Sequence, residues 1–170
     1  IYLWRRARFD EAEKALRRAI SLLPLDGFRI RLADLLEASD KPAEALDVCQ
    51  DLLAETERPR TGPTSLPKLY DRIGTLFHAL GRSDEAVAAI QKGIKLLDAK
   101  TDEGLLERSF MLSNLAVVYQ GVSKDPQALE SLLKALADAR AGENQPQVTR
   151  MLHNLGIVLM GQKDLDRAAA

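Results

Sequence analysis

Few residues of this 170-residue chain have the types and the spacing that catalysis or metal binding requires. The two histidines, His78 and His153, lie far apart and have no Cys or second His nearby, so we expect no metal site. The paired acids at 10–11 and 84–85 fall where helices would begin, and the helix macrodipole explains them without a catalytic role. The sequence also lacks a Gly-rich phosphate loop, G-x-S-x-G and H-E-x-x-H. We therefore predict no catalytic residue, no metal and no cofactor, and hence a protein that is not an enzyme.

Composition narrows the kind of partner and the compartment. The 24 basic and 25 acidic residues leave a net charge of −1, which is too small to attract nucleic acid or an anionic membrane. No apolar run approaches the roughly 18 residues of a membrane-spanning helix. The single cysteine, Cys49, cannot form an internal disulfide, and its place on an apolar stripe predicts a core residue. We expect a cytoplasmic protein with no nucleic-acid or membrane partner.

A short pattern recurs along the chain at near-constant spacing. An apolar residue precedes Gly or Ala, Leu or an aromatic residue follows three positions later, and Ala comes nine residues after that. The four copies are Leu32-Ala33-x-x-Leu36 with Ala45, Ile73-Gly74-x-x-Phe77 with Ala86, Leu115-Ala116-x-x-Tyr119 with Ala128, and Leu155-Gly156-x-x-Leu159 with Ala168. Together with Ala12, these alanines are separated by 33, 41, 42 and 40 residues. Periods of about 20–50 residues indicate a solenoid, in which each unit buries its apolar face only against its neighbours.

The apolar residues within each unit follow the period of a helix. Ile73, Phe77 and Leu80 lie at i, i+4 and i+7, on one face, and no stretch alternates with period two, so we expect no sheet. Gly81 marks a turn, the residues from Gly161 to Asp164 frame a last turn, and the proline-rich segment 57–65 reads as a spacer loop. The expected helices lie near 1–7, 10–23, 27–38, 42–56, 67–80, 84–99, 104–121, 126–140, 146–161 and 164 onward.

These units resemble the tetratricopeptide repeat. Two segments, Arg8-Phe9-Asp10-Glu11-Ala12 and Gly81-Arg82-Ser83-Asp84-Glu85-Ala86, look like the start of the second helix of a unit. In this repeat, the small residues Gly74, Ala116 and Gly156 would let the first helix approach the second. The resemblance implies an all-α fold, an α-solenoid of stacked antiparallel helix-turn-helix repeats with a right-handed superhelix. It divides the chain, which we take to be part of a longer protein, into about five units of which the first and last are incomplete: 1–25, 26–58, 67–100, 104–141 and 146–170.

The later units look more like the longer repeats of kinesin light chain and of the Leu-Gly-Asn-repeat scaffolds. In those families an Asn immediately before the Leu faces the groove and hydrogen-bonds the backbone of an extended peptide. Asn114 and Asn154 would take that role here, whereas Arg31 and Arg72 occupy the matching positions of earlier units and depart from the pattern. The carboxylate clamp of chaperone-binding members needs Lys and Asn at set positions. We do not expect that clamp, because its positions hold Ile30 with Asp34 and Asp71 with Thr75.

The first helix of each tetratricopeptide unit lines the concave face, so residues opposite its core stripe are candidates for binding a partner. We expect a protein or an extended peptide, with its backbone held by Asn114 and Asn154 and a side chain near Phe110, Val117 and Ile157. An Asn amide can serve both the donor and the acceptor of a peptide bond. The full predicted groove set is Arg31, Asp34, Glu37, Lys68, Asp71, Arg72, Thr75, His78, Phe110, Ser113, Asn114, Val117, Gln120, Arg150, His153, Asn154, Ile157 and Met160.

Two alternative functions stay open. The repeats could mediate homo-oligomer contacts through apolar faces exposed at the terminal repeats, such as Leu3 and Trp4 or Val158 and Leu159. They could also form the regulatory or sensor region of a larger enzyme or transcription regulator.

Overall fold

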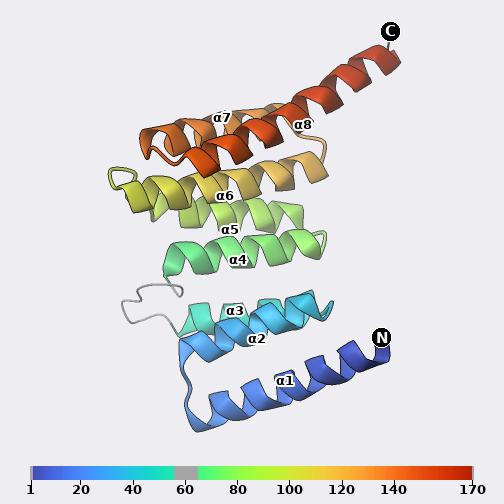
Figure 1. The fold of residues 1–170 in the computed structure, drawn as a ribbon, viewed down its shortest axis with the longest axis vertical. Coiled ribbons are helices and arrows are strands. Elements are labelled where there is room, and N and C mark those ends of the chain that lie inside the picture. Colours follow the sequence, from blue (N-terminus) through green and yellow to red (C-terminus); the bar gives the residue numbers. More distant parts are fainter. Residues whose placement is uncertain (1, 56–64, 170) are drawn as a thin grey trace.

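A computed structural model describes the backbone of residues 2–55 and 65–169 and, within these ranges, the side chains of 8–55 and 65–161. Helices lie across one long axis in a single stack, with α1 at one end and α7 and α8 at the other (Figure 1). The described ranges contain no strand, and none of their helices is long and apolar enough to span a membrane. The helices are α1 (Tyr2–Leu22), α2 (Asp26–Ala38), α3 (Pro42–Ala54), α4 (Leu66–Ala79), α5 (Ser83–Lys95), α6 (Asp102–Gly121), α7 (Asp125–Ala141) and α8 (Gln145–Ala169).

The packing is that of helical hairpins placed side by side, so the predicted all-α solenoid is confirmed. Each helix contacts the next one in sequence, and α4 also contacts α6, as α6 does α8. We call α2, α4, α6 and α8 the A helices, and α3, α5 and α7 the B helices. Since α4, α6 and α8 touch in order while the described B helices α3, α5 and α7 do not touch one another, this part of the stack curves toward the A side. The A helices therefore line its inner face.

The turns between the two helices of each hairpin share one hydrogen-bond pattern. Asp40, Gly81 and Ser123 each adopt a left-handed backbone, with φ of 61°, 74° and 56°. In each turn the following residue donates its backbone N–H to a carbonyl five residues back, at 2.9 Å. This arrangement is the Schellman motif, which satisfies carbonyls at a helix C-terminus. The left-handed conformation favours glycine, and of these three positions only residue 81 is a glycine.

The core is a continuous layer of small and aliphatic side chains between the helices. Leu36, Leu52, Leu69, Leu76 and Ile90 are fully buried, and each contributes about 1.5–3 kcal/mol by leaving water. The motif alanines of the B helices are completely buried as well: Ala45, Ala86 and Ala128. Side chains of this size allow the B helices to approach the A helices closely.

Two of the predicted small-residue contacts differ sharply in the structure. A Cβ added at Gly74 would overlap Ile90 Cγ1 and lie 3.1 Å from the backbone oxygen of Ala86, so α4 and α5 need a glycine there. A Cβ added at Gly156 would meet no described atom within 4 Å. The prediction that Gly156 serves a close contact with the second helix of its own hairpin is therefore wrong for this structure, because α8 continues to Ala169 and no further helix follows it within the described residues.

Both ends of the stack depart from the expected helix boundaries. The two helices predicted at 1–7 and 10–23 form one helix, α1, because the residues between them include no Gly or Pro that would interrupt it. Likewise α8 runs for 25 residues through Gly161 and Asp164, where we expected a turn. A glycine inside a helix costs only about 1 kcal/mol, which is too little to force an end. The predicted loop at 57–65 lies outside the described residues apart from Ser65.

Candidate functional site

Polar side chains connect each A helix to the next along the inner face of the stack. Residues three or four apart share one face of a helix, so Phe110, Asn114 and Val117 lie together on α6. The same spacing places Arg150, Asn154 and Ile157 together on α8. On α4 the corresponding face carries Lys68, Asp71, Arg72 and Thr75.

An arginine bridges α2 and α4. Arg72 forms ion pairs with Asp34 and, at 3.4 Å, with Glu37. The guanidinium also lies close enough to Cys49 on α3 to influence its titration. Burial raises the pKa of the Cys49 thiol to about 11, and the neighbouring positive charge of Arg72 opposes that rise. Cys49 is fully buried, as expected for a core residue, so it has no role on the inner face.

The seam between α4 and α6 combines an ion pair with a charge-assisted hydrogen bond. Lys68 Nζ lies 2.5 Å from Glu107 Oε1. Asn114 Nδ2 donates to both carboxylate oxygens of Asp71, at 3.1 and 3.0 Å. Burial raises the pKa of Asp71, and the hydrogen bond from Asn114 acts in the opposite direction. Asp71 is thus a partly buried carboxylate whose hydrogen-bond partner, the amide of Asn114, is neutral.

The seam between α6 and α8 is held by neutral and aromatic contacts. Asn154 Nδ2 donates to Ser113 Oγ at 3.2 Å. The Arg150 guanidinium lies 4.2 Å from the centre of the Phe110 ring, a cation–π distance. Val117 and Ile157 remain about half exposed on the same face. This end of the inner face therefore offers apolar contacts beside amide groups.

A hollow of about 650 Å³ lies on the inner face beside α4. It opens there because the backbones of α2 and α4 do not contact each other within the described residues, unlike those of α4 and α6. Apolar side chains of α2 and α4 line part of it, and charged and polar ones line the rest. The lining residues are Ile30, Glu37, Lys68, Leu69, Asp71, Arg72, Thr75 and Asn114.

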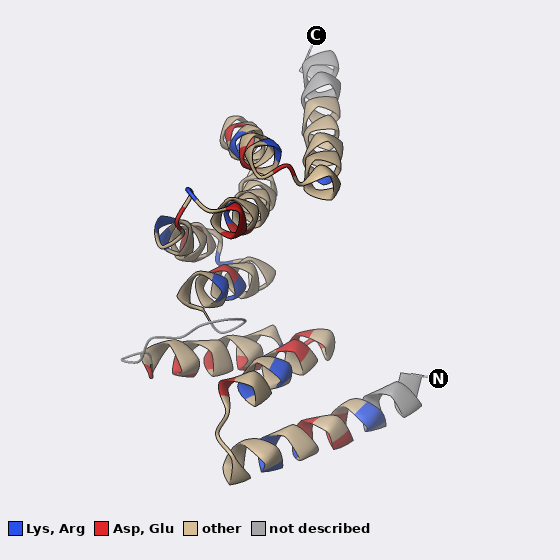
Figure 2. Ribbon diagram, turned by 60° about the vertical axis from the view of Figure 1, so that its left-hand side comes forward, with Lys and Arg blue, Asp and Glu red and all other residues tan. Residues whose placement is uncertain are grey.

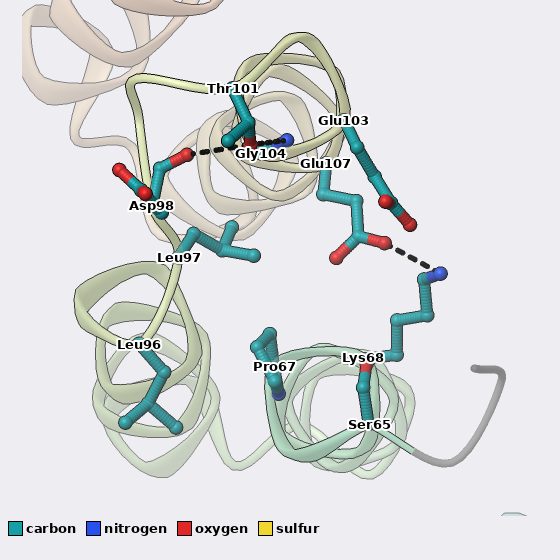
Figure 3. Close-up of a pocket in the computed structure, with 10 residues that line it drawn as sticks. All are labelled: Ser65, Pro67, Lys68, Leu96, Leu97, Asp98, Thr101, Glu103, Gly104 and Glu107. Carbon is teal, nitrogen blue, oxygen red and sulfur yellow. Dashed lines mark hydrogen bonds and ion pairs between the residues drawn. The ribbon is translucent and has the colours of Figure 1, made fainter. Parts of the chain in front are cut away.

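A second, smaller hollow of about 210 Å³ adjoins the first at Lys68, where α4 and α6 begin (Figure 3). The Lys68–Glu107 ion pair crosses its mouth, and Leu97 and Pro67 lie on the opposite side. The α6 N-terminus is fixed by Thr101, whose Oγ accepts from Gly104 N at 3.0 Å. Because a Cβ at residue 104 would collide with the backbone of Asp98, this wall requires glycine.

Charges of both signs are interspersed on the same helices, so the described surface shows no extended field of one sign (Figure 2). On the inner face, Lys68 and Arg72 pair with nearby acids, whereas Arg150 lies over the Phe110 ring. A partner that binds the inner face would therefore be selected by contacts with individual residues and not by an overall charge.

The structure brings most of the predicted groove residues onto the inner face, but they serve different purposes. Ser113 is buried under Asn154, and the ring of His78 abuts Gly121 at the end of α6, so neither is open to a partner. Arg31 and His153 are exposed. Sequence reasoning missed Leu69 and Glu107. Leu69 belongs to the core stripe and is 1% exposed, so it lies at the floor of the hollow. Glu107 lies one turn before Phe110, the first predicted groove residue of α6.

A family model described as tetratricopeptide repeat matches residues 67–96, the hairpin of α4 and α5. The hairpin of α4 and α5 is a tetratricopeptide repeat. The comparison with curated proteins yields no match. The family match over residues 67–96 confirms the resemblance to the tetratricopeptide repeat that was inferred from the small residues of the motif.

Solved structures share the fold of this chain at low sequence identity. BtubC (BKLC) from P. vanneervenii is 22% identical with a TM-score of 0.69, over 95% of this chain and 67% of that one. One MamA structure is 17% identical with a TM-score of 0.64, over 96% of this chain and 79% of that one. A second MamA structure is 14% identical with a TM-score of 0.59, over 96% and 94%. At these identities the similarity shows the fold alone.

Proposed function

We propose that this chain is a protein–protein interaction scaffold whose inner face binds an extended peptide segment of a partner. The observation that carries the proposal is the inner face itself. It has a hollow beside α4 and, further along, half-exposed Val117 and Ile157 next to amide side chains. Apolar points among fixed polar groups are typical of sites that orient a ligand as well as bury it.

The amide geometry favours one mode of backbone capture. The Nδ2 atoms of Asn114 and Asn154 already donate to neighbouring A helices. Their carboxamide oxygens are then the atoms suited to accept backbone N–H groups of a guest. This differs from the two-sided clamp expected from the sequence, in which each amide would serve a donor and an acceptor of the same peptide bond.

Display selection tests the proposal without a known partner. Random 12-residue peptides are selected on the purified chain, and the binding of enriched peptides is mapped by hydrogen exchange. We expect protection of α4, α6 and α8, and a roughly tenfold loss of affinity in the Asn114→Ala/Asn154→Ala double variant, since each lost hydrogen bond contributes about 0.5–1.5 kcal/mol. Gln50→Ala removes an exposed amide from α3 and serves as the control. Failure to enrich any peptide, or protection confined to the B helices, would overturn the proposal.

A second candidate function is self-association through α8. Leu152, Gly156 and Leu159 form one stripe of α8, and Leu152 is 47% exposed, whereas its counterpart on α6, Leu112, is 7% exposed under α7. A second copy of the chain could cover this stripe. Light scattering across protein concentrations checks this, with Leu152→Asp/Leu159→Asp as the dissociating variant. A wild-type chain that stays monomeric at all concentrations contradicts it.

A further inference from the structure

The hollow beside α4 has an unusual balance of charge. Its two cations are already paired, Lys68 with Glu107 and Arg72 with Asp34 and Glu37. Asp71 also lines the hollow, and among the described residues its recorded partner is the neutral amide of Asn114. The lining itself holds two carboxylates, Glu37 and Asp71, and two cations. Because Asp34 and Glu107 lie beside the hollow and already pair with those cations, Asp71 is the carboxylate of the lining that lacks a cationic partner among the ion pairs of the described residues.

The environment of Asp71 makes it responsive to an added cation. The carboxylate is partly removed from water, and an anion in that situation is less favourable unless an opposite charge or enough hydrogen bonds replace the lost water. The hydrogen-bonding amide of Asn114 carries no charge, so it compensates Asp71 less than a cation would. A guest ammonium or guanidinium near Asp71 would supply the missing charge.

The remaining lining suits the stem of a long basic side chain. Ile30 and Leu69 contribute the apolar part of the hollow. Lys and Arg bury their methylene stems along apolar surface while their charged ends reach a polar partner. A guest carboxylate would instead meet Asp71 and Glu37, and the cations that could attract it are already neutralised.

We propose that the hollow between α2 and α4 receives a Lys or Arg side chain of the guest peptide, with its charged end on Asp71 and its stem against Ile30 and Leu69. This inference rests on the proposed peptide-binding function and adds to it the chemistry of one anchor residue. It places the charge selectivity of the groove at α4, whereas the amides of α6 and α8 would hold the peptide backbone.

The test uses the peptides enriched by display. We expect them to contain Lys or Arg, and replacing that residue by norleucine, which keeps the stem and removes the charge, should weaken binding about tenfold or more. Hydrogen bonds to charged groups contribute about 1.5–3 kcal/mol, which corresponds to that range. Asp71→Asn should remove the difference between the Lys and norleucine peptides. Asp47→Asn, which changes an exposed acid of α3, should preserve it.

A charge exchange separates recognition from folding. Asp71→Lys should bind the peptide whose Lys or Arg is replaced by Glu more tightly than it binds the original peptide, and circular dichroism verifies that each variant folds. Enriched peptides that map to the inner face but lack Lys and Arg would overturn the cation anchor and leave the peptide-binding function standing. A Lys preference that persists in Asp71→Asn would also overturn it. If no peptide is enriched at all, the peptide-binding function fails and the anchor fails with it.

Discussion

Two glycines at the same motif position should respond in opposite ways to substitution by alanine. Gly74 in α4 and Gly156 in α8 both follow the apolar residue that opens the motif. In a helix interior, alanine is about 1 kcal/mol more favourable than glycine, so propensity alone would stabilise both variants. Any difference between them must come from what the new methyl group meets.

At Gly74 the methyl group meets packed atoms. It would overlap Ile90 Cγ1, a mid-chain atom of a fully buried residue, and approach the Ala86 backbone oxygen to 3.1 Å. Overpacking of this kind costs about 1–3 kcal/mol, so Gly74→Ala should lose up to about 2 kcal/mol after the propensity gain. At Gly156 the methyl group meets open space, and Gly156→Ala should gain about 0.5–1 kcal/mol.

Urea denaturation at low protein concentration measures both changes as free energies of unfolding. Because unfolding of a repeat array can lose cooperativity, the slope of free energy against urea must match that of the wild type before values are compared. Thermal melting gives a second measure, with a shift of about 2–4 °C per kcal/mol for a chain of this length. Equal destabilisation by the two substitutions would refute the reasoning, since it would mean that a helix packs on Gly156 in solution.

Three further predictions concern the core. Leu115→Ala removes a side chain that is 5% exposed and should cost about 2–5 kcal/mol in urea denaturation. Asp138→Ala breaks the bidentate contact in which Arg108 Nε donates to Asp138 Oδ2 at 2.7 Å, and it should lower the free energy of unfolding by about 1–3 kcal/mol. Lys134→Ala removes the exposed ion pair with Glu130 on the same helix and should lower it by less than about 1 kcal/mol. The raised pKa of Cys49, about 11, favours the neutral thiol in the folded state, so the contribution of this group to stability is complete below its unfolded pKa near 9 and is lost as pH rises through 11. Iodoacetamide at pH 8 should accordingly leave the folded chain unlabelled and label it in urea.

The sequence was sufficient for the repeat architecture because its signal is local. Close packing within a hairpin demands small residues at fixed spacing, and Gly74 with Ala86 shows the contact that produces the pattern. Helix faces follow from the same periodicity. The pattern does not, however, specify whether a turn forms after it, which is why the break expected at Gly161 is absent from α8.

The contacts of the inner face were harder to predict for a different reason. They depend on how far each A helix lies from the next, and that distance is set by connections between hairpins. Asp71 and Asn114 are 43 residues apart, and Ser113 and Asn154 are 41 apart, so side chains that meet across a seam share no local pattern. The sequence therefore identified Asn114 and Asp71 as groove residues without showing that they bind each other.

The polar contacts between neighbouring A helices carry less charge from the α2 end of the inner face to the α8 end. The residue just before the motif's apolar position donates to the preceding A helix in all three cases, but its partner changes. Arg72 pairs with two carboxylates, Asn114 with one carboxylate and Asn154 with a hydroxyl. A hydrogen bond to a charged group contributes about 1.5–3 kcal/mol and a neutral one about 0.5–1.5 kcal/mol, so a guest displaces the Asn154–Ser113 bond more readily than the Asn114–Asp71 bond. The acids that pair with Arg72 are about half exposed, and water screens those pairs. The inner face is therefore suited to hold a guest side chain in the fixed hollow beside α4 and to adjust to its backbone near α8.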